Sequence, residues 1–272
     1  MIEVHDLSVE LGDRTILRGV DLMAPAARLT AVIGPNGSGK STLLKALCRD
    51  HRYHGDVLIN GRNLATLSPA EAATQRAVLP QANTLPFPFT VREVVAMGLT
   101  AGRPGPTGEA LQHLPEQALA TVDLCHFGGR FYGELSGGEQ QRVQLARVLC
   151  QVWQPVLDGL PRYLLLDEPV SSLDVRHQLM IMDVARRFAD SGGGVIAVLH
   201  DLNLAAMYAD HVVALRAGTV VAAGPAEQVI TDAVVAEVFD CPLRVGFAPP
   251  PGAPFVLPQS IRRHAPVHSR VA

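Results

Sequence analysis

The stretch Gly34-Pro35-Asn36-Gly37-Ser38-Gly39-Lys40-Ser41-Thr42 decides the fold of this 272-residue chain. It matches the pattern G-x-x-x-x-G-K-[ST], a glycine-rich loop that binds phosphate between a strand and a helix. An apolar run at 29–33 precedes the loop, and a helix is expected from Ser41 onward. The glycines allow successive backbone N–H groups to point inward and to bind a phosphate at the start of that helix. The stretch therefore predicts an α/β protein that binds a nucleoside triphosphate.

The lysine of this loop stands out in the composition. The chain has 23 Lys and Arg residues, and only Lys40 and Lys45 are lysines, which leaves 23 − 2 = 21 arginines. A lysine ammonium is a compact point charge that fits inside a tight backbone loop, whereas a guanidinium is planar and larger. We expect Lys40 to bridge the β- and γ-phosphates and the Ser41 hydroxyl to bind Mg²⁺.

Strands alternate with helices along most of the chain, which predicts a largely parallel α/β sheet. The apolar runs at 163–167 and 195–199 are continuous, as in parallel strands that are buried on both faces. Two antiparallel strands are expected before the phosphate loop, at 2–10 and 14–22, with a turn at Gly12-Asp13. The N-terminal part is therefore expected to form a separate antiparallel β subdomain.

A helical lobe is expected to interrupt the nucleotide-binding part, at about residues 83–150. Thr90 and Glu93 have the spacing of a capping box at a helix start, and a second helix is expected at about 109–124. Residues 1–248 thus predict one domain with this lobe inserted. Residues 249–272 are rich in proline at their start and predict an irregular tail.

Charge and composition exclude several classes of protein. The net charge is −3 and no long basic run is present, which argues against nucleic acid as a partner. No apolar stretch reaches the roughly 20 residues that a membrane-spanning helix needs, and the N-terminus does not have the pattern of a signal peptide. The four cysteines lie far apart without metal-ligand spacing, so we expect reduced, mostly buried thiols in a soluble, cytoplasmic protein.

Four further features carry chemistry. Asp167 and Glu168 follow an apolar strand, where one carboxylate can hold Mg²⁺ and the next can polarise water for attack on a γ-phosphate. Gln81 and His200 end two other strands, and parallel sheets bring such ends together. Each of these residues alone has an ordinary structural interpretation. The octapeptide Leu-Ser-Gly-Gly-Glu-Gln-Gln-Arg at 135–142 changes that, because it is a second glycine-rich helix start able to hold phosphate.

With these motifs the chain resembles the ATP-binding-cassette (ABC) ATPases, over about residues 1–240. The resemblance implies an active ATPase with ATP and Mg²⁺ as ligands, and it assigns the family's functional positions in this sequence. By this resemblance the Walker A loop is Gly34–Thr42, the Q-loop residue is Gln81 and the signature motif is 135–139. The Walker B motif is Asp167 with Glu168, the D-loop is 172–174 and the switch residue is His200. It implies catalytic roles for Glu168, His200 and Gln81, and metal binding by Ser41, Gln81 and Asp167. Besides the loop itself, it assigns nucleotide contacts to Gln81, Asp167, Ser136, Gly137 and Gly138.

The two glycine-rich helix starts predict a dimer. They are expected on different lobes, so a single ATP could hardly be held by both within one chain. In a head-to-tail homodimer, Ser136 and Gly138 of one copy would cover the γ-phosphate that Lys40 of the other copy binds. ATP would then hold the two copies together, and hydrolysis would release them.

One position departs from the family pattern. Similar proteins have an aromatic residue in the first hairpin that stacks on adenine, and here Leu11 occupies that place. Stacking of a base on an aromatic side chain contributes about 1–3 kcal/mol. We therefore expect nucleotide binding with poor discrimination between ATP and GTP.

The resemblance is closest to cassettes of the importers for haem, iron chelates and cobalamin. It implies a peripheral protein at the cytoplasmic face of the inner membrane, a polytopic permease dimer as partner and, indirectly, a periplasmic substrate-binding protein. The apolar run 85–89 beside Gln81 is a candidate surface for the permease, or simply part of the lobe's core. Haem is favoured as cargo by two similarities to haem-import cassettes, with ferric siderophores or cobalamin as the alternative. They are the lengthened link at 151–162 and the run 169–174 followed by 176–178. An exporter with a separate membrane subunit stays open as an alternative. The alternative from a different class is a soluble cassette ATPase that moves no solute.

Overall fold

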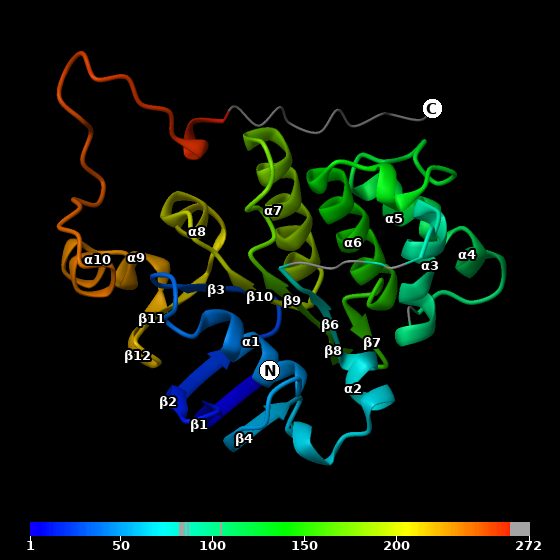
Figure 1. Cartoon of the computed structure of the whole chain (residues 1–272), viewed down its shortest axis with the longest axis horizontal. Coiled ribbons are helices and arrows are strands. Elements are labelled where there is room, and N and C mark those ends of the chain that lie inside the picture. Colours follow the sequence, from blue (N-terminus) through cyan, green and yellow to red (C-terminus); the bar gives the residue numbers. More distant parts are fainter. Residues whose placement is uncertain (82–84, 86, 104, 262–272) are drawn as a thin grey trace.

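The structure is a computed structural model, and it describes residues 1–81, 85, 87–103 and 105–261. A six-stranded sheet in the order β12-β11-β3-β10-β9-β6 crosses the middle of the molecule (Figure 1). Its strands are β3 (Leu29–Ile33), β6 (Arg76–Leu79), β9 (Tyr163–Asp167), β10 (Gly194–Val198), β11 (His211–Arg216) and β12 (Thr219–Pro225). All neighbours pair in parallel except the hairpin of β11 and β12. The carboxyl ends of β3, β6, β9 and β10 therefore lie along one edge, where parallel sheets place their binding sites.

A second, antiparallel sheet has the order β2-β1-β4-β5. Its strands are β1 (Ile2–Leu11), β2 (Arg14–Ala24), β4 (His54–Ile59) and β5 (Arg62–Asn63). The expected N-terminal antiparallel subdomain is confirmed, although both of its first strands run slightly further than predicted. Figure 1 shows this sheet below helix α1 (Lys40–Cys48).

Two hydrophobic cores lie on the two faces of the central sheet. Alternate residues of β9 point to opposite faces, as in any strand: Leu164 and Leu166 belong to one core, and Leu165 belongs to the other. The first core joins the sheet to α7 (Val175–Asp190), α8 (Leu202–Tyr208) and the helical lobe. The second core packs α1 between the central sheet and the antiparallel sheet. Helix α1, which follows the phosphate loop, is thereby held on both sides.

The helical lobe consists of α3 (Val91–Ala101), α4 (Glu109–Gln112), α5 (Leu114–Thr121) and α6 (Gly137–Gln151). Thr90 and Glu93 form the predicted capping box at the start of α3. The single helix expected at about 109–124 is wrong, because the chain forms two helices that meet at His113. Pro115 explains the break, since proline lacks an N–H and is tolerated only in the first turn of a helix.

Several elements were not anticipated from the sequence. They are α2 (Pro69–Gln75), the small hairpin of β7 (Val156–Leu157) and β8 (Leu160–Pro161), and the short helix α9 (Ala226–Val229), which precedes α10 (Asp232–Phe239). Helix α2 had a readable signal, since Ser68 and Glu71 form a capping box before it. The hairpin lies within the segment 151–162, which connects α6 to β9.

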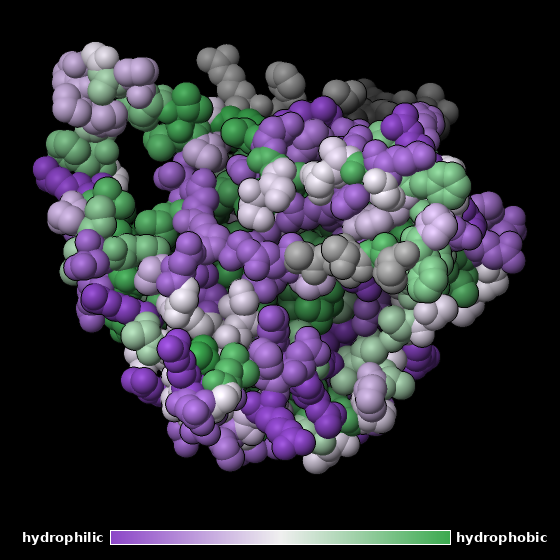
Figure 2. Space-filling view, viewed as in Figure 1, coloured by the Kyte–Doolittle hydropathy of each residue, from purple (hydrophilic) through white to green (hydrophobic). Residues whose placement is uncertain are grey.

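Beyond α10 the chain leaves the body of the protein and returns near α8 (Figure 1). It contains one 3₁₀ turn, Pro258–Ser260, and Gln259 Nε2 donates to the carbonyl oxygen of Asn203 at 3.1 Å. Apolar side chains gather along this projecting segment (Figure 2), among them the exposed Leu243 and Phe247. The part of the predicted tail at 262–272 lies outside the described residues.

Two expectations about composition can be compared with the structure. Cys150 is buried and Cys48 is partly buried, but Cys125 and Cys241 are exposed, so the expectation of mostly buried thiols is wrong. In the described part of the chain, we find no helix that combines the length and the apolar character needed to cross a membrane.

Candidate functional site

The phosphate loop connects β3 to α1 at the edge where the parallel strands end. Gly34 has φ +149°, and a Cβ atom at this position would lie 2.1 Å from the carbonyl oxygen of Leu215 on β11. Gly39 has φ +103°, and a Cβ atom there would lie 2.5 Å from Leu17 Cδ2. Both positions thus require glycine, for space and for backbone conformation. The tight loop that the pattern predicts is therefore enforced by its neighbours β2 and β11.

The Lys40 side chain folds back onto its own loop. Its Nζ donates to the carbonyl oxygens of Gly34 and Pro35, both at 2.9 Å. Burial lowers the pKa of Lys40, while the carboxylates of Glu168 and Asp167 act in the opposite direction. The ammonium is consequently held in place at the loop by two neutral carbonyl groups, which a phosphate can replace as charged acceptors.

Asp167 ends β9 and faces the first turn of α1. Ser41 Oγ donates to Asp167 Oδ1 at 3.0 Å, and Asp167 is almost fully buried. Burial raises the pKa of Asp167, and the hydrogen bond from Ser41 partly offsets that rise. Ser41, Asp167 and Gln81 line one groove. The three residues assigned to metal binding are thus brought together from three different elements.

The Glu168 carboxylate lies between the side chains of Gln81 and His200. Gln81 Nε2 donates to Glu168 Oε2 at 2.8 Å, and His200 Nε2 lies 2.6 Å from Glu168 Oε1. These three residues line a second groove with Asn36 and Gly37 of the phosphate loop. β6 ends at Leu79, so Gln81 lies two residues beyond the strand that it was expected to end. Its amide binds the glutamate in this structure.

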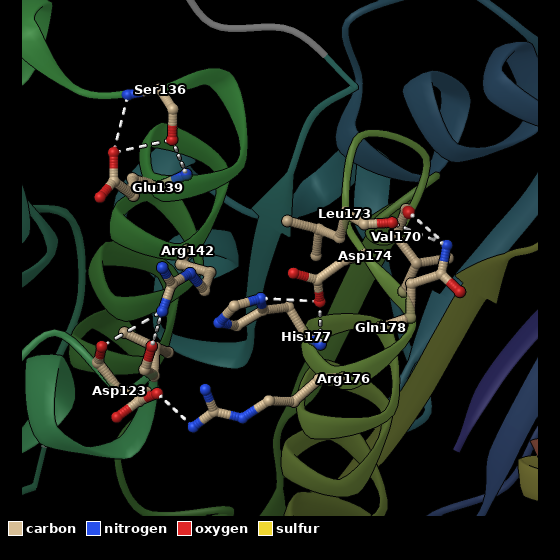
Figure 3. Close-up of polar contacts among 11 residues, drawn as sticks. Asp123, Ser136, Glu139, Arg142, Val170, Leu173, Asp174, Arg176, His177 and Gln178 are labelled. Carbon is tan, nitrogen blue, oxygen red and sulfur yellow. Dashed lines mark hydrogen bonds and ion pairs between the residues drawn. The ribbon is translucent and has the colours of Figure 1, made fainter.

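The start of α6 is stabilised by its own residues (Figure 3). The backbone N–H and the hydroxyl of Ser136 donate to Glu139 Oε2 at 2.8 and 2.7 Å, and Ser136 Oγ accepts from the N–H of Glu139. The hydrogen bonds from the Ser136 hydroxyl and N–H lower the pKa of Glu139. Among the described residues that line the two grooves at the phosphate loop, none comes from 136–138. Among the described residues, the sequence motifs therefore meet at one site except for this helix start and the D-loop at 172–174.

Gly138 packs against the D-loop, the segment 172–174. A Cβ atom on Gly138 would lie 3.0 Å from Leu173 Cδ2 and 3.4 Å from the carbonyl oxygen of Ser172, whereas a Cβ atom on Gly137 would meet nothing within 4 Å. Both glycines lie in the first turn of α6. The close approach of α6 to the D-loop thus depends on the second glycine.

We expect Gly137→Ala to raise the free energy of unfolding by about 0.5–1 kcal/mol, because alanine lowers the backbone entropy of the unfolded chain. Gly138→Ala should lose that gain, because its Cβ atom would crowd Leu173. Its free energy of unfolding should therefore be about 1 kcal/mol lower than that of Gly137→Ala. Urea unfolding of the two variants and the parent chain measures both values. Equal stabilities of the two variants would contradict the packing argument.

The D-loop is held by a set of hydrogen bonds around the start of α7 (Figure 3). Asp174 caps the helix, since its Oδ1 accepts from the N–H of His177 at 2.9 Å, and Gln178 Nε2 donates to the carbonyl oxygens of Val170 and Leu173. Arg176 forms an exposed ion pair of 2.9 Å with Asp123 of the helical lobe. These contacts connect the segment after Glu168 to the lobe that carries α6.

Two residues at the site were missed by the sequence analysis. Gln141 Nε2 donates to the carbonyl oxygen of Glu168 at 3.1 Å, and Ser171 Oγ donates to the same oxygen at 3.2 Å. The available signal was weak, because it consisted only of the position of Gln141 within the octapeptide at 135–142. Both contacts are to backbone, and sequence patterns rarely reveal such contacts.

Comparisons with known proteins agree with this geometry. Residues 17–171 match the family model of the ABC transporter. The chain is 59% identical over 260 residues to the hemin import ATP-binding protein HmuV of Mesorhizobium japonicum, covering 96% of this chain and 99% of that protein. It is 56% identical over 263 residues to the protein of the same name from Rhizobium meliloti, covering 96% and 99%.

Solved structures of ATP-binding cassettes are similar to this chain as well. The dimeric structure of a post-hydrolysis state of the ATP-binding cassette MJ0796 bound to ADP and Pi superimposes with a TM-score of 0.71 at 25% identity, covering 83% of this chain and 99% of that one. The family match spans the phosphate loop, the helix start at 136–138, and Asp167 and Glu168 at the end of β9. The chain therefore belongs to the ABC transporter family, as an ATP-binding subunit that hydrolyses ATP to drive transport.

Proposed function

We propose that this protein is the ATP-hydrolysing subunit of a haem importer. In this proposal it acts at the cytoplasmic face of the inner membrane with a polytopic permease dimer and, indirectly, a periplasmic substrate-binding protein. The observation that carries the ATPase is the Glu168 carboxylate held between Gln81 and His200 beside the phosphate loop. The cargo is inferred from the near-complete overlap with relatives named as hemin import ATP-binding proteins.

The residues at the loop fit a Mg²⁺ ion. Ser41 Oγ and Asp167 Oδ1 are 3.0 Å apart, and the Gln81 amide shares their groove, so hydroxyl, carboxylate and amide oxygens are available. Such hard oxygen donors are the ligands that Mg²⁺ prefers. When bound with ATP, Mg²⁺ would neutralise charge on the β- and γ-phosphates.

The chain's own residues then supply the remaining chemistry. Lys40 exchanges the carbonyls of Gly34 and Pro35 for phosphate oxygens, which are charged and bind an ammonium more strongly. Glu168 accepts a hydrogen bond from the attacking water and receives its proton as the water oxygen bonds to the γ-phosphorus. The bond from the γ-phosphorus to the β–γ bridging oxygen breaks, and ADP leaves. His200 and Gln81 fix the direction of that carboxylate through their two hydrogen bonds.

A head-to-tail homodimer completes the site in this proposal. Ser136, Gly137 and Gly138 lie outside the grooves beside the loop, which supports their contribution to the nucleotide of a second copy. ATP binding would bring the helix start of one copy onto the phosphates held by the other copy. Hydrolysis would then separate the two copies and return the permease to its other conformation.

The surface proposed for the permease lies just beyond Gln81. Phe87 is 67% exposed, whereas Leu85 and Phe89 are partly buried and pack against the core. The rings of Phe87 and Phe89 meet edge to face at a centroid distance of 6.1 Å. Pro86, also part of the predicted apolar run, lies outside the described residues. Phe87 is therefore the side chain that we propose enters the contact.

Transport by the reconstituted complex tests the proposed function. The subunit is co-purified with its proposed permease partner, inserted into liposomes with ATP inside, and supplied with binding protein and haem outside. We expect ATP-dependent uptake of haem, with a ferric siderophore and cobalamin transported at least tenfold more slowly. If the siderophore or cobalamin were taken up faster than haem, that compound would be the cargo instead of haem. ATP hydrolysis without uptake of any of the three compounds would favour a cassette that moves no solute.

Leu11 gives a separate prediction about the base. It ends β1, is 41% exposed, and offers no aromatic ring for adenine. We expect the Kd values for ATP and GTP to lie within about threefold of each other, and Leu11→Tyr to tighten ATP binding about tenfold by stacking. Titration with both nucleotides measures this, and Met23→Tyr, at an exposed site on β2, is the control. A strong preference of the unchanged chain for ATP would contradict the prediction.

A further inference from the structure

The backbone of Glu168 has an unusual conformation. Its φ is +50°, in the left-handed region that non-glycine residues rarely adopt. This conformation turns the chain directly after β9 and directs the carboxylate toward Gln81 and His200. Such backbone strain persists only where the surroundings hold it in place.

The carbonyl group of Glu168 is held from two directions. Ser171 Oγ donates to it at 3.2 Å from the turn that follows, and Gln141 Nε2 donates to it at 3.1 Å from α6. Gln141 is partly buried, and its Oε1 atom is buried without a hydrogen-bond partner among the described residues. A buried amide with one end unsatisfied costs free energy, so this side chain is not placed there by stability alone.

Helix α6 has a second contact with the same segment of chain, through Gly138 and the D-loop. One side of α6 therefore contacts both the backbone of the proposed base and the segment that follows it. The first residues of the same helix are those that the proposed homodimer places on the partner's nucleotide. A movement of α6 on dimerisation must change the hydrogen bond of Gln141, because the carbonyl of Glu168 belongs to the other lobe.

We propose that Gln141 is a positioning residue that couples the direction of the Glu168 carboxylate to the placement of α6. The inference rests on the proposed homodimer and on Glu168 as the base. Closure of α6 on the partner's ATP keeps the Glu168 carbonyl bound and the carboxylate aimed at water. When α6 is out of place, the carbonyl loses this donor and the carboxylate loses its fixed direction. Each copy thereby hydrolyses its own ATP only when it also covers the ATP of its partner.

The test uses Gln141→Met in the complete complex with its permease, because methionine keeps the volume but cannot donate. We expect kcat to fall about tenfold, the loss typical of one orienting hydrogen bond, while the Kd for ATP changes less than twofold. A purely structural role would instead weaken ATP binding and nucleotide-driven dimerisation together. Turnover within twofold of the unchanged complex would overturn the proposal.

A double-mutant cycle separates action through Glu168 from any other route. In the Glu168→Gln background, Gln141→Met should not lower the residual hydrolysis further, because the group that it positions is already gone. A further tenfold loss would show that Gln141 acts independently, and would also overturn the proposal. Gln140→Met is the matched control, since the amide of Gln140 binds the carbonyls of Tyr132 and Leu135 instead. Any loss of turnover that Gln140→Met causes should be the same in the unchanged complex and in the Glu168→Gln background.

The same measurements show whether the inference or the proposed function fails. If Glu168→Gln alone keeps near-normal turnover, the base is wrong and the proposed mechanism fails with it. If Glu168→Gln lowers turnover as expected, but Gln141→Met alone leaves turnover near that of the unchanged complex, only the coupling through α6 is refuted.

Discussion

Glu168→Gln is expected to lower ATP turnover by about 10³-fold while ATP still binds, because a positioned general base contributes about 10²–10⁴-fold. The substitution keeps the shape of the side chain and removes its ability to accept a proton. Gln81 and His200 are in hydrogen-bond contact with both carboxylate oxygens, which orients the proposed base. We therefore expect the loss to appear in kcat.

A second consequence of Glu168→Gln is a dimer that no longer separates. In the proposed homodimer, blocked hydrolysis leaves ATP between Lys40 of one copy and the start of α6 of the other copy. Gel filtration with MgATP measures the dimer, and a phosphate-release assay measures turnover. Glu10→Gln, at an exposed site on β1, is the control and should change neither value. Turnover near that of the unchanged protein would rule out Glu168 as the base.

Lys40→Ala is expected to weaken ATP binding about 100-fold, or about 2.7 kcal/mol, because the phosphates lose a charged hydrogen-bond donor. The ammonium of Lys40 sits on two loop carbonyls, so nucleotide meets a donor that is already placed. Truncation also leaves the carbonyls of Gly34 and Pro35 without this partner, and part of the loss comes from a less ordered loop.

Lys45→Ala is the matched control for this prediction. Lys45 is the only other lysine of the chain, lies on the same helix, and is exposed. Titration with a fluorescent ATP analogue should give a Kd within threefold of the parent protein for Lys45→Ala. If Lys40→Ala bound as tightly as this control, the loop would hold phosphate through its backbone N–H groups alone.

Most of the fold could be predicted because its signals are local. The glycines around Lys40, the apolar runs of β9 and β10, and the capping box of α3 all lie within short windows of sequence. The predictions failed where a single residue decided the outcome, as with Pro115, which divides the second lobe helix into α4 and α5. They also missed short elements such as β7 and β8, whose periodicity is too brief to read.

The members of the candidate site could be named from motifs, but not their contacts. Glu168 and His200 are 32 positions apart, and Gln81 and Glu168 are 87 apart. The parallel order of β6, β9 and β10 brings them within hydrogen-bond distance. No local pattern encodes which side chain of one strand end meets that of another.

By itself the sequence determined the phosphate loop, the class of ligand and the family, because these depend on backbone groups and residue types within a few adjacent positions. Only the tertiary structure decided that Glu168 has a left-handed backbone, that Gln81 and His200 bind its carboxylate, and that α6 reaches its carbonyl through Gln141. The physical reason is that hydrogen bonds act over about 3 Å, whereas the residues that form them are distant along the chain until the sheet and the helical lobe have packed together.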